Sequence, residues 1–239
     1  MKFKDILTYI VFISLLIFVI SYSVAQPFGA DILQNTTETK NATPAESLDP
    51  AGGTFTTIVL NVSSQNLKWK AYIGNVTGVL TLDDEEDYSI FQWAVSTFSG
   101  SVFASRNDSI TWDNVECASD INITREDTAM NHTTTADDSI NTTFKIKIHK
   151  QFWIGTKNIA QSSCRSAFTW ANNTAQTPSV DAPFQEVLLH DGLNMIYTTF
   201  IYDDAQGFDF NSYDFQMIVP ENGVASNPNT RYYFYMELQ

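Results

Sequence analysis

The chain has 239 residues, of which 13 are basic and 27 acidic, and its formal net charge is −14. A surface this acidic repels phosphates, which argues against nucleic-acid binding and against docking on an anionic membrane through a basic face. The length suits one all-β domain of ordinary size with a buried core.

Residues 1–25 have the pattern of an export signal. Lys2 and Lys4 precede a largely apolar run, and Ser23-Val24-Ala25 puts small residues where a signal peptidase cleaves. The alternative is an uncleaved membrane anchor, because a span needs about 20 apolar residues and this segment nearly provides them. Both interpretations leave the lysines cytoplasmic and the rest of the chain extracellular, with membrane contact only through this segment.

Residues 26–53 are polar and proline-containing, and have too few apolar residues to pack. We interpret them as a linker or stalk, with an edge strand inside them as the alternative. The apolar segment Thr54–Val62 is expected to begin the folded domain, which then spans residues 54–239.

The segment from Leu67 to Trp112 predicts antiparallel strands. Period-two alternation runs through Trp69–Ile73, and the acidic run Asp83–Asp87 is typical of a hairpin loop between two strands. A strand is also expected to start at Ile110. Short strands joined by Gly, Asn and Asp turns indicate an all-β, mostly antiparallel β-sandwich.

Two short helices are expected in the middle of the chain. The first is capped at Thr124 with Asp127 three residues later, and the second is a helical turn within Asp138–Phe144. Lys145–His149 alternates as a strand does, and Phe152–Ile159 is typical of a hairpin around Gly155.

Four strands are expected in the last third: Phe184–Leu189, Asn194–Tyr202, Tyr213–Val219 and Arg231–Leu238. The final strand should lie inside the sheet, because it alternates large apolar residues almost to the chain end whereas tails are normally polar.

N-glycosylation is the strongest chemical signal. Nine acceptor tripeptides begin at Asn35, Asn41, Asn61, Asn75, Asn107, Asn122, Asn131, Asn141 and Asn172. Each requires an exposed amide, so the motif also marks surface positions. The Asn- and Thr-rich composition inflates this number, but we expect most of the sites to be modified if the host has the transferase.

Cys117 and Cys164 are the two cysteines of the chain. In an exported protein the default is a disulfide, which here would close a loop of about fifty residues and contribute about 4 kcal/mol in the chain-entropy model. A metal ligand or a nucleophile is the alternative, although neither a His nor a further Cys stands at ligand spacing.

Acidic loops suggest a possible calcium site. Asp209, Asn211 and Asp214 are the better candidates, because alternate positions in an extended segment put Asp209 and Asn211 on one side. The hairpin loop at Asp83–Asp87 is the other candidate. Against both loops, their spacing differs from the calcium-loop motif, and acidic loops are usually just solvated. Apart from calcium, no cofactor is expected.

Catalytic signals are weak. His190-Asp191 could be half of a catalytic dyad, but His132, His149 and His190 are scattered and no Gly-x-Ser-x-Gly motif is present. Aromatic residues make up 13% of the chain, which fits a β-core or, alternatively, a sugar-stacking platform.

One further pattern spans most of the chain after the leader. It comprises Trp69-Lys70-Ala71-Tyr72-Ile73-Gly74-Asn75, Leu82-Asp83-Asp84, Cys117, Asp138-Ser139-Ile140, Cys164, Tyr213-Asp214-Phe215-Gln216 and the closing Tyr232-Tyr233-Phe234-Tyr235. With these motifs the chain resembles a family of uncharacterised archaeal secreted or cell-surface proteins. The resemblance implies a cell-surface location and supplies no catalytic motif.

The sequence therefore predicts a non-enzymatic, N-glycosylated extracellular protein of the cell surface, acting as an envelope, filament or adhesion component with envelope or self-assembly partners. The alternatives are a carbohydrate- or ligand-binding β-sandwich module, with glycans as partners, and a secreted hydrolase.

Overall fold

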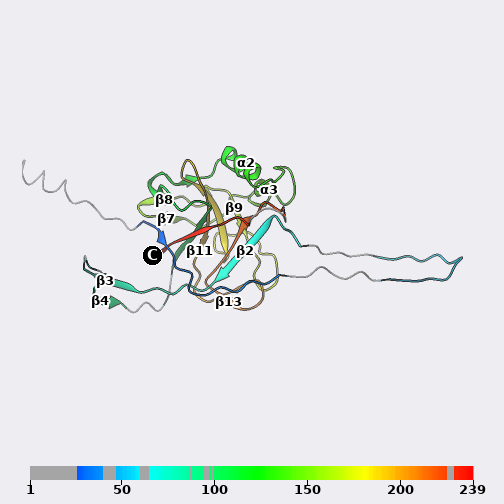
Figure 1. Ribbon diagram of the computed structural model, residues 1–239, viewed down its shortest axis with the longest axis horizontal. Coiled ribbons are helices and arrows are strands. Elements are labelled where there is room, and N and C mark those ends of the chain that lie inside the picture. The colour runs from blue at the N-terminus through cyan, green and yellow to red at the C-terminus, as the bar shows by residue number, and fades with distance from the viewer. Residues whose placement is uncertain are drawn as a thin grey trace, which may run out of the picture.

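The structure is a computed structural model that describes residues 26–39, 47–59, 65–84, 86, 88–93, 97, 99–224 and 229–238. The expected leader lies outside these residues, as do the acceptors Asn41 and Asn61. The described chain is all-β and mostly antiparallel with two short α-helices, which confirms the predicted fold class (Figure 1).

A seven-stranded antiparallel sheet forms the body of the fold. Its strands run in the order β1-β15-β5-β11-β10-β6, with β9 also paired to β10. Their bounds are β1 Phe28–Gly29, β15 Tyr233–Leu238, β5 Gly100–Ser105, β11 Met195–Phe200, β10 Gln185–His190, β6 Glu116–Cys117 and β9 Ser166–Phe168.

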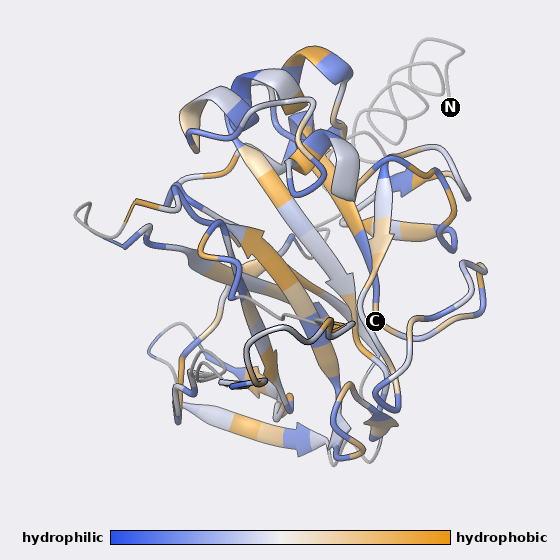
Figure 2. Ribbon diagram, turned by 90° about the vertical axis from the view of Figure 1, so that its right-hand side faces the viewer, coloured by the Kyte–Doolittle hydropathy of each residue, from blue (hydrophilic) through white to orange (hydrophobic). Residues whose placement is uncertain are grey.

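The central strands β5, β10 and β11 are buried along their whole length. Successive side chains point to opposite faces, so each strand supplies two cores. On β10, Leu188 belongs to one cluster, whereas Val187 and Leu189 belong to the other. Figure 2 shows apolar segments along the strands in the middle of the molecule.

Different elements cover the two faces of this sheet. The pair β2 (Trp69–Gly74) and β14 (Phe215–Pro220) packs over one face together with helices α2 (Asp120–Ala129) and α3 (Ile140–Thr143). The hairpin of β7 (Phe152–Ile154) and β8 (Lys157–Ile159) packs over the other face. It contributes Phe152, Ile154 and Ile159 to the core there, and Cys164 joins the same core. The large sheet is therefore packed from both sides.

Two further two-stranded pairs lie apart from the large sheet. They are β3 (Leu80–Asp83) with β4 (Ser89–Trp93), and β12 (Ala205–Gln206) with β13 (Ser212–Tyr213).

Three local predictions differ from the structure. Helix α2 begins earlier than expected: Ser119 caps it through a capping box with Asn122, and Thr124 lies inside the helix with its hydroxyl donating to the carbonyl oxygen of Asp120. The strand expected from Ile110 is instead a 3-10 turn, η1 (Trp112–Asn114).

The alternating segment Lys145–His149 forms no strand. Its backbone makes one isolated bridge, between Ile146 and Ser166. The hydroxyl of Ser166 also accepts from the N–H of Ile148 at 3.1 Å and donates to the carbonyl oxygen of the same residue at 2.8 Å. A side chain therefore satisfies backbone groups that a neighbouring strand would otherwise pair.

The expected linker contributes a strand of the large sheet. Phe28 pairs with Met236 and Gly29 with Tyr235, which is the edge-strand alternative for this segment. Residues 54–59 form no strand, and Phe55 and Val59 are almost fully exposed. Figure 1 shows residues 47–59 lying away from the sandwich, with a turn at their far end.

The C-terminal strand lies inside the sheet, as predicted. β15 pairs with β5 over its whole length and with β1 on its other side. Tyr232, Phe234 and Met236 join one core, and Tyr235 packs against the other.

Candidate functional site

The hairpin β3–β4 is an exposed apolar element of the described chain. Leu82 pairs with Phe91 and Leu80 with Trp93. Every residue of β4 is exposed, with exposed fractions of 70% for Ile90, 55% for Phe91 and 48% for Trp93. Among the described residues the two strands pair only with each other, and Figure 1 shows them projecting to one side of the sandwich.

Local hydrogen bonds hold the tip of this hairpin together. Asp83 accepts from the hydroxyl groups of Thr81 at 2.7 Å and Ser89 at 2.6 Å, and these bonds lower the pKa of its carboxyl group. Asp84 accepts from the backbone N–H of Tyr88 at 2.8 Å. The rings of Phe91 and Trp93 meet edge to face at 4.9 Å.

A two-stranded hairpin is at best marginally stable alone in water, and exposed strand edges offer unpaired backbone groups to other chains. Contiguous apolar surface of this kind commonly marks an interaction site. The hairpin β3–β4 is therefore the candidate assembly surface.

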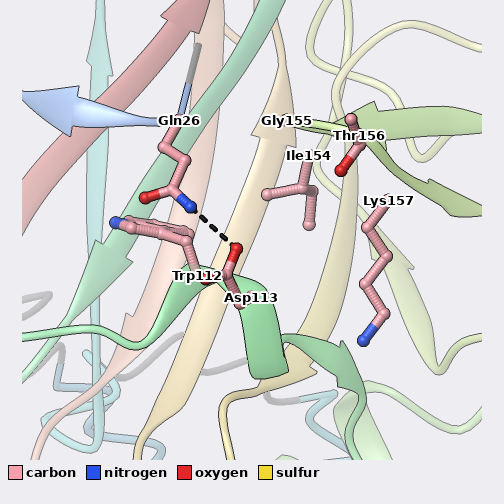
Figure 3. Close-up of a pocket in the computed structure, with 7 residues that line it drawn as sticks. All are labelled: Gln26, Trp112, Asp113, Ile154, Gly155, Thr156 and Lys157. Atoms are coloured by element: carbon pink, nitrogen blue, oxygen red, sulfur yellow. Dashed lines mark hydrogen bonds between the residues drawn. The ribbon is translucent and has the colours of Figure 1, made fainter. Parts of the chain in front are cut away.

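A second candidate site is a pocket of about 300 Å³ between the 3-10 turn and the β7–β8 hairpin (Figure 3). Its lining residues are Gln26, Trp112, Asp113, Ile154, Gly155, Thr156 and Lys157. The side-chain amide of Gln26 donates to a carboxylate oxygen of Asp113 at 2.8 Å. The ring of Trp112 contacts the rings of Phe103 and Tyr235 edge to face, and its centroid lies 5.1 and 5.3 Å from theirs. A rigid ring beside a carboxylate, an amide and an amine is a surface that can bind a small polar ligand.

The side chains of the candidate dyad His190-Asp191 hydrogen-bond to nearby backbone groups. The carboxylate of Asp191 accepts from the N–H groups of Leu193, Asn194 and Thr111, and these bonds lower its pKa against the effect of burial. Nδ1 of His190 accepts from the N–H of Gly192 at 2.9 Å. The carboxylate is therefore engaged in closing the β10–β11 turn.

His149 is fully buried beside the disulfide. Its Nε2 accepts from the N–H of Cys164 at 2.9 Å, and its Nδ1 lies 2.8 Å from the carbonyl oxygen of Lys150. Burial lowers the pKa of this imidazole. The neutral tautomer with a proton on Nδ1 satisfies both contacts, which indicates a structural histidine.

The predicted disulfide is confirmed: Cys117 is bonded to Cys164 across a sequence separation of 47 residues. It ties β6, at one edge of the large sheet, to the loop before β9.

Seven of the nine acceptor asparagines lie in the described chain, and the structure divides them by what their side chains contact. Asn35, Asn75, Asn107, Asn131 and Asn172 are exposed, and of these only Asn107 makes a side-chain hydrogen bond to another described residue. The amide nitrogen of Asn107 donates to Asn194 at 3.0 Å, that of Asn141 donates to the carbonyl oxygen of Thr134 at 3.4 Å, and that of Asn122 lies 3.2 Å from Nε2 of His190. Glycosylation of all nine stays a prediction.

The calcium candidates accept hydrogen bonds from the protein. Buried Asp214 accepts from the N–H groups of Val76 at 2.6 Å and Asp204 at 3.0 Å. Asp209 accepts from the side chains of Asn211 at 2.8 Å and Tyr213 at 3.0 Å. No group of three or more His, Cys, Asp or Glu side chains suited to a metal occurs among the described residues. Calcium would have to compete with these donors, and the site stays a hypothesis.

Sequence reasoning missed two buried carboxyl groups. Glu186 on β10 is fully buried, and its Oε2 accepts from the N–H of Ile218 on β14 at 2.9 Å. Burial raises its pKa well above the ordinary value. Glu126 on α2 receives two bonds from Arg106, at 2.9 and 2.6 Å. The signal for Glu186 was a single acid inside an apolar run, Phe184–Leu189.

Comparisons of the chain with protein-family models, with curated proteins and with solved structures find no match. Within the part of the chain that the structure describes, no helix is long and apolar enough to cross a membrane. The resemblance to archaeal surface proteins therefore remains a prediction from the sequence motifs.

Proposed function

We propose that the chain is a non-enzymatic, N-glycosylated extracellular protein of the cell surface that assembles with copies of itself or with envelope partners. The observation that carries the proposal is the hairpin β3–β4, whose apolar strands project from the sandwich and, among the described residues, pair only with each other. The disulfide supports export, because such bonds persist in oxidising compartments. The leader pattern and the nine acceptor tripeptides support the same location.

The test compares the exported full-length protein with a variant that carries Ile90→Ser, Phe91→Ser and Trp93→Ser. Light scattering over a range of concentrations, with electron microscopy of the concentrated sample, measures assembly. We expect the native protein to form multimers and the variant to stay monomeric with an unchanged melting midpoint, because β4 packs mainly on β3.

Leu193→Ser is the matched control, since Leu193 is 89% exposed on the β10–β11 turn and should leave assembly intact. The proposal would be contradicted if the native protein stayed monomeric at every concentration when isolated host envelope is present.

A second candidate function is a carbohydrate- or ligand-binding module, which the pocket between Trp112 and Lys157 favours. A glycan array with the native protein and with Asp113→Ala tests it. Specific binding that the substitution abolishes, together with a monomeric native protein, would favour this function over assembly.

A further inference from the structure

The loop 170–174 presents an acceptor tripeptide in a tight turn. Asn172 and Asn173 have φ angles of 50° and 51°, and Ala171 and Thr174 form an isolated antiparallel bridge around them. Two successive left-handed residues are typical of a type I′ turn, in which Asn is favoured. Asn172 is exposed, and Thr174 completes the acceptor motif.

This turn rests on a second loop, residues 207–211. The backbone N–H groups of Asn172 and Asn173 donate to the carbonyl oxygens of Gly207 at 2.8 Å and Phe208 at 2.7 Å. The buried side chain of Gln216 bridges the same loops: it donates to the carbonyl oxygen of Trp170 at 2.9 Å and accepts from the N–H of Phe208 at 2.8 Å. The two loops are therefore fixed to each other as one surface.

Exposed aromatic side chains gather on these two loops. Trp170 is 53% exposed, Phe208 is 44% exposed and Phe210 is 64% exposed. The ring of Phe208 stacks on that of Tyr213, with centroids 6.3 Å apart and an angle of 12° between the planes. Single exposed apolar residues are ordinary, but a group of aromatic residues on adjoining loops marks a contact surface.

We propose that the first sugars of a glycan on Asn172 lie over this aromatic surface, which we define as Trp170, Phe208 and Phe210. The inference rests on the proposed function, because it requires that the chain be glycosylated. The C–H face of a pyranose packs on aromatic rings, so the surface matches the chemistry of the group that would be attached within two residues of Trp170.

The attachment point favours this occupant over a free sugar. A glycan linked to Asn172 meets the rings as an intramolecular partner at high effective concentration, whereas a free sugar must first lose its translational freedom. The glycan would shield the rings from water and from other chains, and would strengthen the contact between the turn and the loop 207–211.

The experiment measures whether the glycan and the rings stabilise each other. Melting midpoints are recorded for the native exported protein and for the same protein after enzymatic or chemical removal of its glycans, in the wild type and in Trp170→Ala. Trp153→Ala is the control, because Trp153 is 44% exposed on β7, in a segment without an acceptor tripeptide. Phe208→Ser is a second test variant, and glycopeptide mass spectrometry measures occupancy at Asn172 in each.

We expect glycan removal to lower the midpoint of the wild type and of Trp153→Ala equally. In Trp170→Ala, glycan removal should lower the melting midpoint by roughly 2–4 °C less than in the wild type. This is the size of effect that one aromatic contact produces in a domain of this length. Equal losses in all variants would overturn the inference.

Other outcomes separate this inference from the proposed function. An unmodified Asn172 in a protein that carries glycans elsewhere would overturn this inference alone. A native protein without sugar at any site would also remove the glycoprotein part of the proposed function. Array binding of free glycans that Trp170→Ala abolishes, with equal midpoint losses, would assign the surface to an external sugar instead.

Discussion

At the scale of single residues, Glu186 should make the fold less stable as the pH rises. Its carboxyl group is buried, which raises its pKa above the ordinary value of 4.5 in the folded state. Above pH 4.5 the unfolded chain releases this proton while the folded chain keeps it, so the free energy of unfolding falls from there up to the raised pKa.

Glu186→Gln should therefore stabilise the protein at neutral pH and have little effect near pH 4. The glutamine oxygen can still accept from Ile218, without an ionisable proton. Chemical denaturation at several pH values measures the difference, and Glu116→Gln, an exposed acid on the neighbouring strand β6, is the control. Parallel pH profiles for Glu186→Gln and the native protein would show that this carboxyl group is not responsible.

A second residue-scale prediction concerns two acceptor sites at opposite ends of helix α2. The carboxamide oxygen of Asn122 accepts from the backbone N–H of Ser119 at 2.9 Å, and its nitrogen contacts His190. Asn131, just past the helix, is exposed. If glycosylation follows folding, attachment at Asn122 requires the helix cap to open, so its occupancy should be several-fold lower than at Asn131. Quantitative glycopeptide mass spectrometry of native protein tests this, and equal occupancy would contradict it.

At the scale of elements, periodicity predicted the strands that bury one or both faces. The strands β10, β11 and β15 are predicted from their apolar side chains, which any β-fold would bury away from water. The failures share a different cause. Lys145–His149 alternates well, yet the hydroxyl group of Ser166, 18 residues from Ile148 in the chain, hydrogen-bonds to the backbone of Ile148. Contacts such as Asn122 with His190, 68 residues apart, arise only from the tertiary fold.

The strand β15 should be required for soluble secretion. It is paired on both sides, and its side chains enter both cores. Deleting Tyr232 to Gln239 removes these residues and exposes the edge of β5, so the chain should aggregate or be degraded. Deleting Gln239 alone, which keeps every residue of β15, is the control. A secreted truncation that melts like the full-length protein would refute the prediction.

At the scale of the whole molecule, the net charge of −14 should make stability depend on ionic strength. Like charges repel across the compact state, and salt screens this repulsion. Sodium chloride should therefore raise the melting midpoint, with most of the effect below about 0.15 M. This response is the background against which any specific cation effect must be measured.

The calcium hypothesis requires an additional effect at constant ionic strength. An ion that binds only the native state raises the midpoint as its concentration rises. At matched ionic strength, millimolar calcium should then raise the midpoint above the values in magnesium and in chelator. Asp209→Asn should remove that increment but keep the response to sodium chloride, because it removes one carboxylate ligand and changes the net charge by a single unit. Ser212→Ala, directly after Asn211 at the start of β13, is the control. If the midpoint in calcium equals that in chelator, the carboxylate oxygens of Asp209 and Asp214 serve only the hydrogen bonds that hold the loop.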